Sequence, residues 1–176
     1  MTNRTHMVAA VTCSLLYFRL FGIDYTACNE IAALTVAAVV SEIPDIDSPY
    51  SKCGRTFMFV LWPLYLMQHA TKRIAPKIYT WIKHKGIMHW VSFWTAVLIP
   101  LKLVFTSTEV KWIIDGVIIG IGTHLLCDYL AEGIYPYAPF YNKKKKFIIC
   151  IRTGGIIENI FTYILLICCY LLIRGG

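Results

Sequence analysis

Four of the five histidines and three of the ten acidic residues of this chain lie within or beside strongly apolar stretches. An ionisable group at the centre of a membrane helix costs roughly 2.5–3.5 kcal/mol on insertion scales, so these groups are expected to pair with one another or with a metal ion. Imidazole nitrogens and carboxylate oxygens suit Zn²⁺ or Mn²⁺. The residue types therefore predict a site for one or two such divalent ions. The candidate ligands are His6, Asp45, Asp47, His84, His89, His124 and Asp128.

Two pairs among these residues have a spacing that suits metal ligation. His124 and Asp128 are four residues apart on a predicted helix, so their side chains share one face. Asp45 and Asp47 stand in the stretch 44–49 (PDIDSP), where the prolines predict an ordered turn from which both carboxylates can reach one ion. The alternatives are a hydrogen-bonded His–Asp pair buried among helices and a polar loop that ends a transmembrane helix.

The other three histidines are less regularly placed. His84 and His89 are five residues apart, and Gly86 between them can mark the junction of a loop and a helix. His84 would then point into the site from the loop and His89 from the helix. His6 precedes the first apolar stretch, where a lone histidine is commonly solvated. His69 stands apart from this pattern, and we expect it at the membrane interface.

Three further residues are candidates for catalysis or substrate binding. Glu158, near the start of the last apolar stretch, is the predicted proton shuttle or general base. Its alternatives are a partner that orients a histidine and a carboxylate stabilised by the helix dipole. Lys85 and Arg152 are predicted to bind an anionic substrate group. A lysine extended toward the interface and an Arg152–Glu158 pair are the corresponding alternatives.

The composition indicates a membrane protein of one domain, residues 1–176. Hydrophobic residues make up 57% of the chain and the mean hydropathy is +0.60. The apolar content of soluble domains is lower, about 45–50%. In such a protein the net charge of +7 is a signal of membrane topology and a surface for anionic lipid, so nucleic acid is not the expected partner. The sequence carries no GxSxG motif and no P-loop.

Six apolar segments can be marked, and their lengths predict the topology. A straight membrane span needs about 20 residues, with about 17 as the lower limit, so five segments qualify and the 11-residue third does not. The fold class is therefore an all-α, polytopic membrane bundle of about five transmembrane helices plus a short re-entrant or interfacial helical hairpin. Gly120 and Gly122 are expected to allow close helix packing. The segments are 7–23, 27–43, 57–67, 87–105, 112–130 and 156–173.

If the third segment does not cross, all seven candidate ligands emerge at one membrane face. The basic residues support this topology, because on this path all seventeen except four lie at that same face. The positive-inside rule makes this the cytoplasmic face of the inner membrane. The four exceptions are Arg19, Lys102, Lys111 and Arg174.

The motifs in this order resemble a known family, the YdjM-type inner-membrane proteins, which are described as LexA-binding and as metal-dependent hydrolases. The resemblance implies a helical membrane fold, metal-dependent hydrolase activity and ligands within the matching motifs. An element written His-Arg-Gly-x-Thr-His-Ser in the family has Lys85, Met88 and Trp90 here, which removes a bidentate arginine. The motifs are Thr5-His6, Pro44-Asp45-Ile46-Asp47, His84-Lys85-Gly86-x-x-His89, Gly122-Thr123-His124-Leu125-Leu126-x-Asp128 and Gly155-x-x-Glu158.

The leading hypothesis is a membrane-embedded metal-dependent hydrolase that uses metal-activated water to cleave an ester. Because the site is expected at the membrane interface beside a basic rim, the expected substrate is a phosphoester of an amphiphilic or lipid molecule. One alternative is a metal-ion or proton transporter that uses intramembrane histidines and aspartates. Another is a non-enzymatic regulatory membrane protein that binds a soluble partner through its basic loops. The sequence leaves the oligomeric state open.

Overall fold

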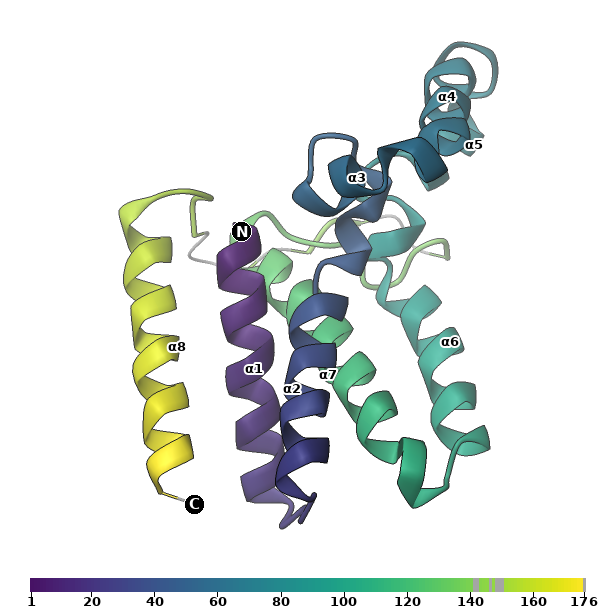
Figure 1. Ribbon diagram of the computed structural model, residues 1–176. Helices are drawn as coiled ribbons and strands as arrows, with labels where there is room; N and C mark the ends of the chain where they lie inside the picture. Colours follow the sequence, from purple (N-terminus) through teal and green to yellow (C-terminus); the bar gives the residue numbers. More distant parts are fainter. Residues whose placement is uncertain (141–142, 146, 148–150, 176) are drawn as a thin grey trace.

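The computed structural model describes residues 1–140, 143–145, 147 and 151–175. Its body consists of long helices that run side by side with roughly aligned axes (Figure 1). Within the described residues the chain is helical apart from loops and one isolated β-bridge. The helices of the body are α1 (Asn3–Leu20), α2 (Ala27–Val40), α6 (Val91–Val104), α7 (Thr108–Ala131) and α8 (Ile156–Arg174).

The predicted class, an all-helical membrane protein, is confirmed, but the predicted number of spans is not. Three stretches of the described chain are long and apolar enough to cross a membrane: Ala27–Asp47, Val110–Ala131 and Ile156–Arg174. Helix α6 is apolar but has only 14 residues. Helix α1 carries Arg4 and Arg19, one near each end. About five transmembrane helices thus stays a prediction.

The third apolar segment belongs to a pair of helices that stands apart from the body (Figure 1). Helix α4 (Met58–Ile74) extends beyond the predicted 57–67, because the polar residues that follow continue the helix. It packs against α5 (Pro76–Ile82), and α4 and α5 have no buried residue. We call this pair the α4–α5 hairpin. The short helix α3 (Lys52–Thr56) precedes it.

Close packing of α2 on α7 depends on two glycines. A Cβ atom on Gly116 would lie 2.7 Å from the carbonyl oxygen of Ala33, and one on Gly120 would lie 2.5 Å from that of Ala37. No larger residue fits at either position without moving a helix. The predicted packing role of Gly120 is therefore correct. That of Gly122 is wrong, because a Cβ atom there would meet nothing within 4 Å.

All polar connections that carry candidate ligands lie at one end of the bundle. The amino terminus of α1 and the carboxyl ends of α2 and α7 lie at this end, and the carboxyl terminus lies at the other (Figure 1). Two short 3₁₀ helices complete it: η1 (Ile43–Asp47) follows α2 and η2 (Ile87–His89) precedes α6. The four basic residues predicted at the opposite face sit in terminal turns of α1, α6, α7 and α8.

Candidate metal centre

The structure brings all seven predicted ligands together in three overlapping groups. Within each group, one ligand atom from every residue lies within 4.8 Å of the others. We call them the inner, middle and outer groups, and the seven residues together the ligand cluster. The inner group is His6, His124 and Asp128; the middle group is Asp45, His89 and His124; the outer group is Asp47, His84 and His89.

His124 is held in one tautomer by the neighbouring helix. Its Nδ1 lies 2.6 Å from the carbonyl oxygen of Ser41, and a carbonyl can only accept, so Nδ1 donates. The neutral ring then carries its lone pair on Nε2. This Nε2 is buried, has no hydrogen-bond partner and lies 3.7 Å from Oδ1 of Asp45. A histidine anchored through one nitrogen with the other left free is typical of metal ligands.

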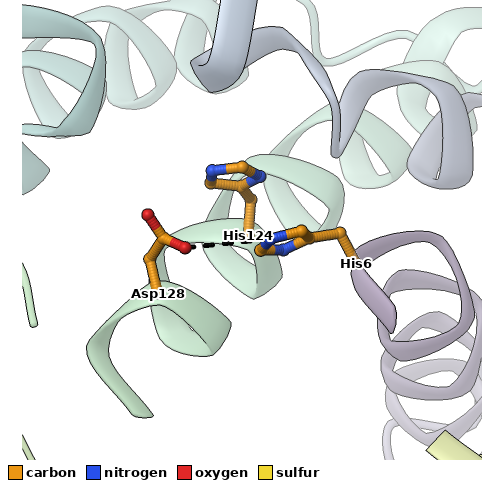
Figure 2. Close-up of side chains that lie close together, drawn as sticks. All are labelled: His6, His124 and Asp128. Atoms are coloured by element: carbon orange, nitrogen blue, oxygen red, sulfur yellow. Dashed lines mark ion pairs between the residues drawn. The ribbon is translucent and has the colours of Figure 1, made fainter. Parts of the chain in front are cut away.

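His6 enters the cluster from the first turns of α1. Its ring stacks on that of His124 with centroids 4.1 Å apart, and its Nε2 lies 3.7 Å from Oδ1 of Asp128. Figure 2 shows the two rings and the carboxylate facing one another from α1 and α7. Both nitrogens of His6 are buried without a hydrogen-bond partner. Two stacked imidazoles repel each other when both are protonated, so the pair favours a neutral state that can bind a cation.

His89 lies among three carboxylates. Its Nε2 is 3.3 Å from Oδ1 of Asp45 and 3.4 Å from Oδ2 of Asp128. Its Nδ1 is 3.7 Å from Oδ2 of Asp47. His84 donates from Nδ1 to Oδ1 of Asp47 at 2.8 Å, and its side chain is 41% exposed. His84 therefore forms the rim of the cluster, whereas His89 is enclosed.

The donor atoms of the cluster fit a divalent cation. A buried polar atom left unpaired costs about 1–3 kcal/mol, and each one in a native site calls for a missing partner. In the described part of the chain, eight buried side-chain atoms have no hydrogen-bond partner, and all of them except Oε1 of Glu42 belong to the ligand cluster. The atoms in the cluster are both nitrogens of His6 and His89, Nε2 of His124, and Oδ2 of Asp47 and Asp128.

Lys85 extends over the edge of the cluster. Its Nζ lies 3.1 Å from Oδ2 of Asp128 and 2.9 Å from Oε2 of Glu132. Burial alone would lower the pKa of Lys85, but these two carboxylates outweigh it and raise the pKa above its usual value. The φ angle of Lys85 is 61°, a conformation uncommon outside glycine that often marks functional sites. Lys85 thus presents a fixed positive charge beside the predicted metal ligands.

Glu158 lies outside all three groups. Its Oε1 accepts hydrogen bonds from the backbone N–H of Thr2 at 2.5 Å and from the hydroxyl of Thr5 at 2.7 Å. Its Oε2 accepts from the backbone N–H of Gly154 at 2.6 Å. These contacts tie the start of α8 to the turn that carries His6, and they favour a positioning role. Arg152 is exposed on the loop before α8 and also lies outside the three groups.

Four residues that help to build the site were missed from the sequence. Ser41 anchors His124 through its backbone. Gln68 donates from Nε2 to the carbonyl oxygens of Asp47 at 2.9 Å and Ile82 at 2.6 Å, which joins the α4–α5 hairpin to the aspartate turn. Tyr65 donates to the carbonyl oxygen of Ile46 at 2.9 Å. The fourth, Glu132, follows Asp128 by one helical turn, and that spacing was a signal that could have identified it.

One of three comparisons with known proteins identifies a family for this chain. No curated protein sequence and no solved structure matches the chain. One family model does match, described as YdjM inner membrane protein, and the match extends over residues 1–175. It includes every helix and every residue of the ligand cluster. The chain therefore belongs to the YdjM inner membrane protein family and is an integral protein of the inner membrane.

Proposed function

We propose that the protein is a membrane-embedded hydrolase that depends on Zn²⁺ or Mn²⁺ and cleaves an ester, a phosphoester of an amphiphilic or lipid molecule. The observation that carries the proposal is the concentration in one cluster of buried histidine and aspartate atoms that have no hydrogen-bond partner. Such atoms are the ligands of hydrolytic metal centres. A purely structural cluster of this kind would leave both nitrogens of His6 and Nε2 of His124 buried without a hydrogen-bond partner.

The grouping of the ligands supports a site for two ions. The inner and outer groups share no residue, so each can hold an ion without taking ligands from the other. Between them, Oδ1 of Asp45 lies 3.3 Å from Nε2 of His89 and 3.7 Å from Nε2 of His124. Asp45 thus lies between the inner group and the outer group. A carboxylate shared between neighbouring sites suits the two-metal arrangement of many phosphoesterases.

The side chains around the cluster are proposed to bind the substrate and to orient the metal ligands. The chemistry that a divalent cation supplies when bound is acidification of a water molecule and polarisation of the ester. Lys85 supplies a charge that can hold a phosphate oxygen beside the cluster. Ser41 fixes the ring of His124, and Glu158 fixes the turn before His6 through Thr5. Proton transfer by Glu158 and anion binding by Arg152 stay predictions.

The site is proposed to face the cytoplasm at the level of the membrane interface. Support comes from the placement of basic residues at the end of the bundle that carries the cluster. The α4–α5 hairpin at the same end exposes large apolar side chains, among them Phe59 at 98%, Trp62 at 56% and Trp81 at 50%. A helix pair with this surface suits partial insertion among lipid head groups. A substrate within the membrane could then reach the cluster from the side.

A hydrolysis assay tests the proposal. Purified protein, stripped with a chelator, is expected to lose turnover of bis(para-nitrophenyl) phosphate and to regain it with Zn²⁺ or Mn²⁺. His89→Ala is expected to abolish turnover, because His89 lies among Asp45, Asp47 and Asp128. His69→Ala is the matched control, since His69 is exposed and belongs to none of the three groups. Turnover that survives both chelation and His89→Ala contradicts a metal-dependent hydrolase.

The transporter alternative has less support. A transporter needs its ionisable groups to be reachable from both membrane faces. The ligand cluster lies at one end of the bundle, and Asp115 nearer the other end is paired with Lys102 at 3.1 Å. Zn²⁺ uptake by proteoliposomes that is lost with His89→Ala would favour the transporter.

A further inference from the structure

A groove of about 420 Å³ runs between α6 and α7. The α7 side of this groove belongs to a stretch that can cross the membrane, Val110–Ala131, so the groove lies at membrane depth. Its lining is almost wholly apolar. The side chains that define it are Val91, Trp94, Leu98, Ile118, Ile121 and Leu125.

One end of the groove adjoins the ligand cluster. Val91 follows His89 by two residues at the start of α6, and Leu125 follows His124 directly on α7. Gly122 also lines the groove, and a Cβ atom there would meet nothing within 4 Å. The absence of a side chain at Gly122 thus leaves the groove open two residues before the ligand His124. A molecule lying in the groove would place its end beside the cluster.

The other end of the groove is polar. Lys102 lines it there, and its Nζ lies 3.1 Å from Oδ1 of Asp115. The hydroxyl of Tyr25 donates to Oδ2 of the same carboxylate at 2.9 Å. Along α6 the groove extends from Val91 to Leu103, about 18 Å at the rise of an α-helix. An apolar groove bounded by an ion pair at one end and by the cluster at the other fits a single hydrocarbon chain of limited length.

A second hollow, of about 200 Å³, has the opposite character. It is lined by Thr80 and by two lysines, two tryptophans and a tyrosine: Lys83, Lys85, Trp81, Trp90 and Tyr135. Lys85 belongs both to this hollow and to the edge of the cluster. The cluster therefore has a basic hollow and an apolar groove as neighbours. This charge distribution matches an anionic amphiphile whose polar head and apolar tail separate at the cluster.

We propose that the α6–α7 groove binds one hydrocarbon chain of an anionic amphiphile whose phosphate lies at the ligand cluster. The inference rests on the proposed function, to which it adds the subsite that binds the hydrocarbon chain of the phosphoester. Gly122 is the residue that keeps the groove open. The bound chain defines the register of the substrate, so the groove selects for chain length.

Alkyl phosphates of increasing chain length test the groove. Binding of butyl, octyl and dodecyl phosphate is measured with wild-type protein, Gly122→Leu and Ala96→Leu. Leucine at position 122 enters the groove, whereas Ala96 is exposed on α6 outside it. Affinity for wild type and Ala96→Leu should rise about three- to fourfold per methylene that becomes buried. With Gly122→Leu the rise should disappear, while inorganic phosphate, which has no chain to enter the groove, should bind all three proteins equally. An equal dependence on chain length in all three proteins overturns the proposal.

Photocrosslinking of the wild-type protein gives a second test, which does not depend on whether a variant folds. Octyl phosphate with a diazirine at the end of its chain should label α6 and α7 near the middle of the groove, at residues such as Leu98, Ile99 and Ile118. Equal labelling of the exposed face of α8 means bulk lipid coverage, and crosslinks to a second copy of this chain mean that α6 and α7 pack in a dimer. Either result overturns the proposal.

The metal content of each protein separates this inference from the proposed function. Gly122→Leu should retain its metal, because residue 122 lines the groove and belongs to none of the three ligand groups. If wild-type protein binds no metal yet shows the chain-length dependence, the hydrolase proposal fails and the groove stands. If metal is bound and the dependence is absent, the groove fails and the metal centre stands.

Discussion

Nδ1 of His124 donates a hydrogen bond to the carbonyl oxygen of Ser41, 2.6 Å away across the contact between α7 and α2. His124 follows Gly120 by one helical turn, and Ser41 follows Ala37 by one turn. The close approach of Gly120 to Ala37 therefore sets the distance over which the hydrogen bond forms. The orientation of a predicted metal ligand is thus determined by helix packing one turn away.

The two glycines of α7 should respond differently to the same substitution. Gly120→Ala places a Cβ atom 2.5 Å from the carbonyl oxygen of Ala37, so α2 and α7 must separate. We expect a loss of about 1–3 kcal/mol in the free energy of unfolding and weaker metal binding. Gly122→Ala meets no atom within 4 Å and should stabilise the helix by up to about 1 kcal/mol. Thermal unfolding in detergent measures both, and equal effects would contradict the packing argument.

Variants of Glu158 distinguish positioning from proton transfer. If Glu158 acts through Thr5 on the turn that carries His6, Glu158→Ala should weaken metal affinity by about 10–100-fold. Thr5→Val should act in the same direction, because it removes the hydroxyl that bonds the carboxylate. Titration calorimetry with Zn²⁺ checks both. A proton shuttle would instead show normal metal affinity with a lowered kcat for Glu158→Gln.

Lys85 should remain a cation over the whole neutral range. Its pKa is raised above the ordinary 10.5 because Asp128 and Glu132 outweigh burial. A raised pKa in the folded state means that the stabilisation from the charge is complete below pH 10.5 and is lost only as pH rises through the higher folded value. Binding of butyl phosphate should therefore not fall off through deprotonation of Lys85 between pH 7 and 9. Lys85→Met should weaken it, and unchanged affinity would exclude Lys85 from anion binding.

Acid should release bound metal. Imidazoles bind cations only when neutral. Burial alone would lower the pKa of His89, but the carboxylates of Asp128, Asp45 and Asp47 raise it from 6.5 to about 10. A bound ion must therefore displace a proton from His89, and Zn²⁺ affinity should fall as pH is lowered through the neutral range. The loss should be reversible on return to pH 7 if the fold survives. Equilibrium dialysis against a series of buffers measures it. Affinity that is independent of pH between 5 and 7 would mean that the histidines are not ligands.

The candidate ligands named from the sequence come together in the structure, whereas several helices differ in extent from the predicted segments. The spacing of His124 and Asp128 and the proline-bounded turn of Asp45 and Asp47 are local features, and the structure places them in one cluster. The shortness of segment 57–67 correctly indicated that the chain returns to the same end. Local patterns could not reveal contacts made by residues distant in sequence. Gln68, for example, is an ordinary helix residue until the fold brings it beside Asp47.

The difference between Gly120 and Gly122 has the same origin. Two glycines two residues apart on one helix face different directions, so at most one can meet a given neighbour. The sequence does not say which face of α7 the helix α2 covers. In the structure Gly120 packs against the backbone of Ala37 on α2, and Gly122 lines the groove between α6 and α7. Gly116, four residues before Gly120, is the second glycine that allows α2 to pack closely, and it was not identified from the sequence.

The metal content of the purified protein is the most direct test of the central claim. Mass spectrometry for metals on wild type, His124→Ala, Asp45→Ala and the control His69→Ala should show one or two divalent ions in wild type and His69→Ala. The two cluster variants should lose metal, because each removes a member of the middle group between the two halves. Full occupancy in both cluster variants, or no bound metal in wild type after loading with Zn²⁺ and Mn²⁺, would contradict a metal centre.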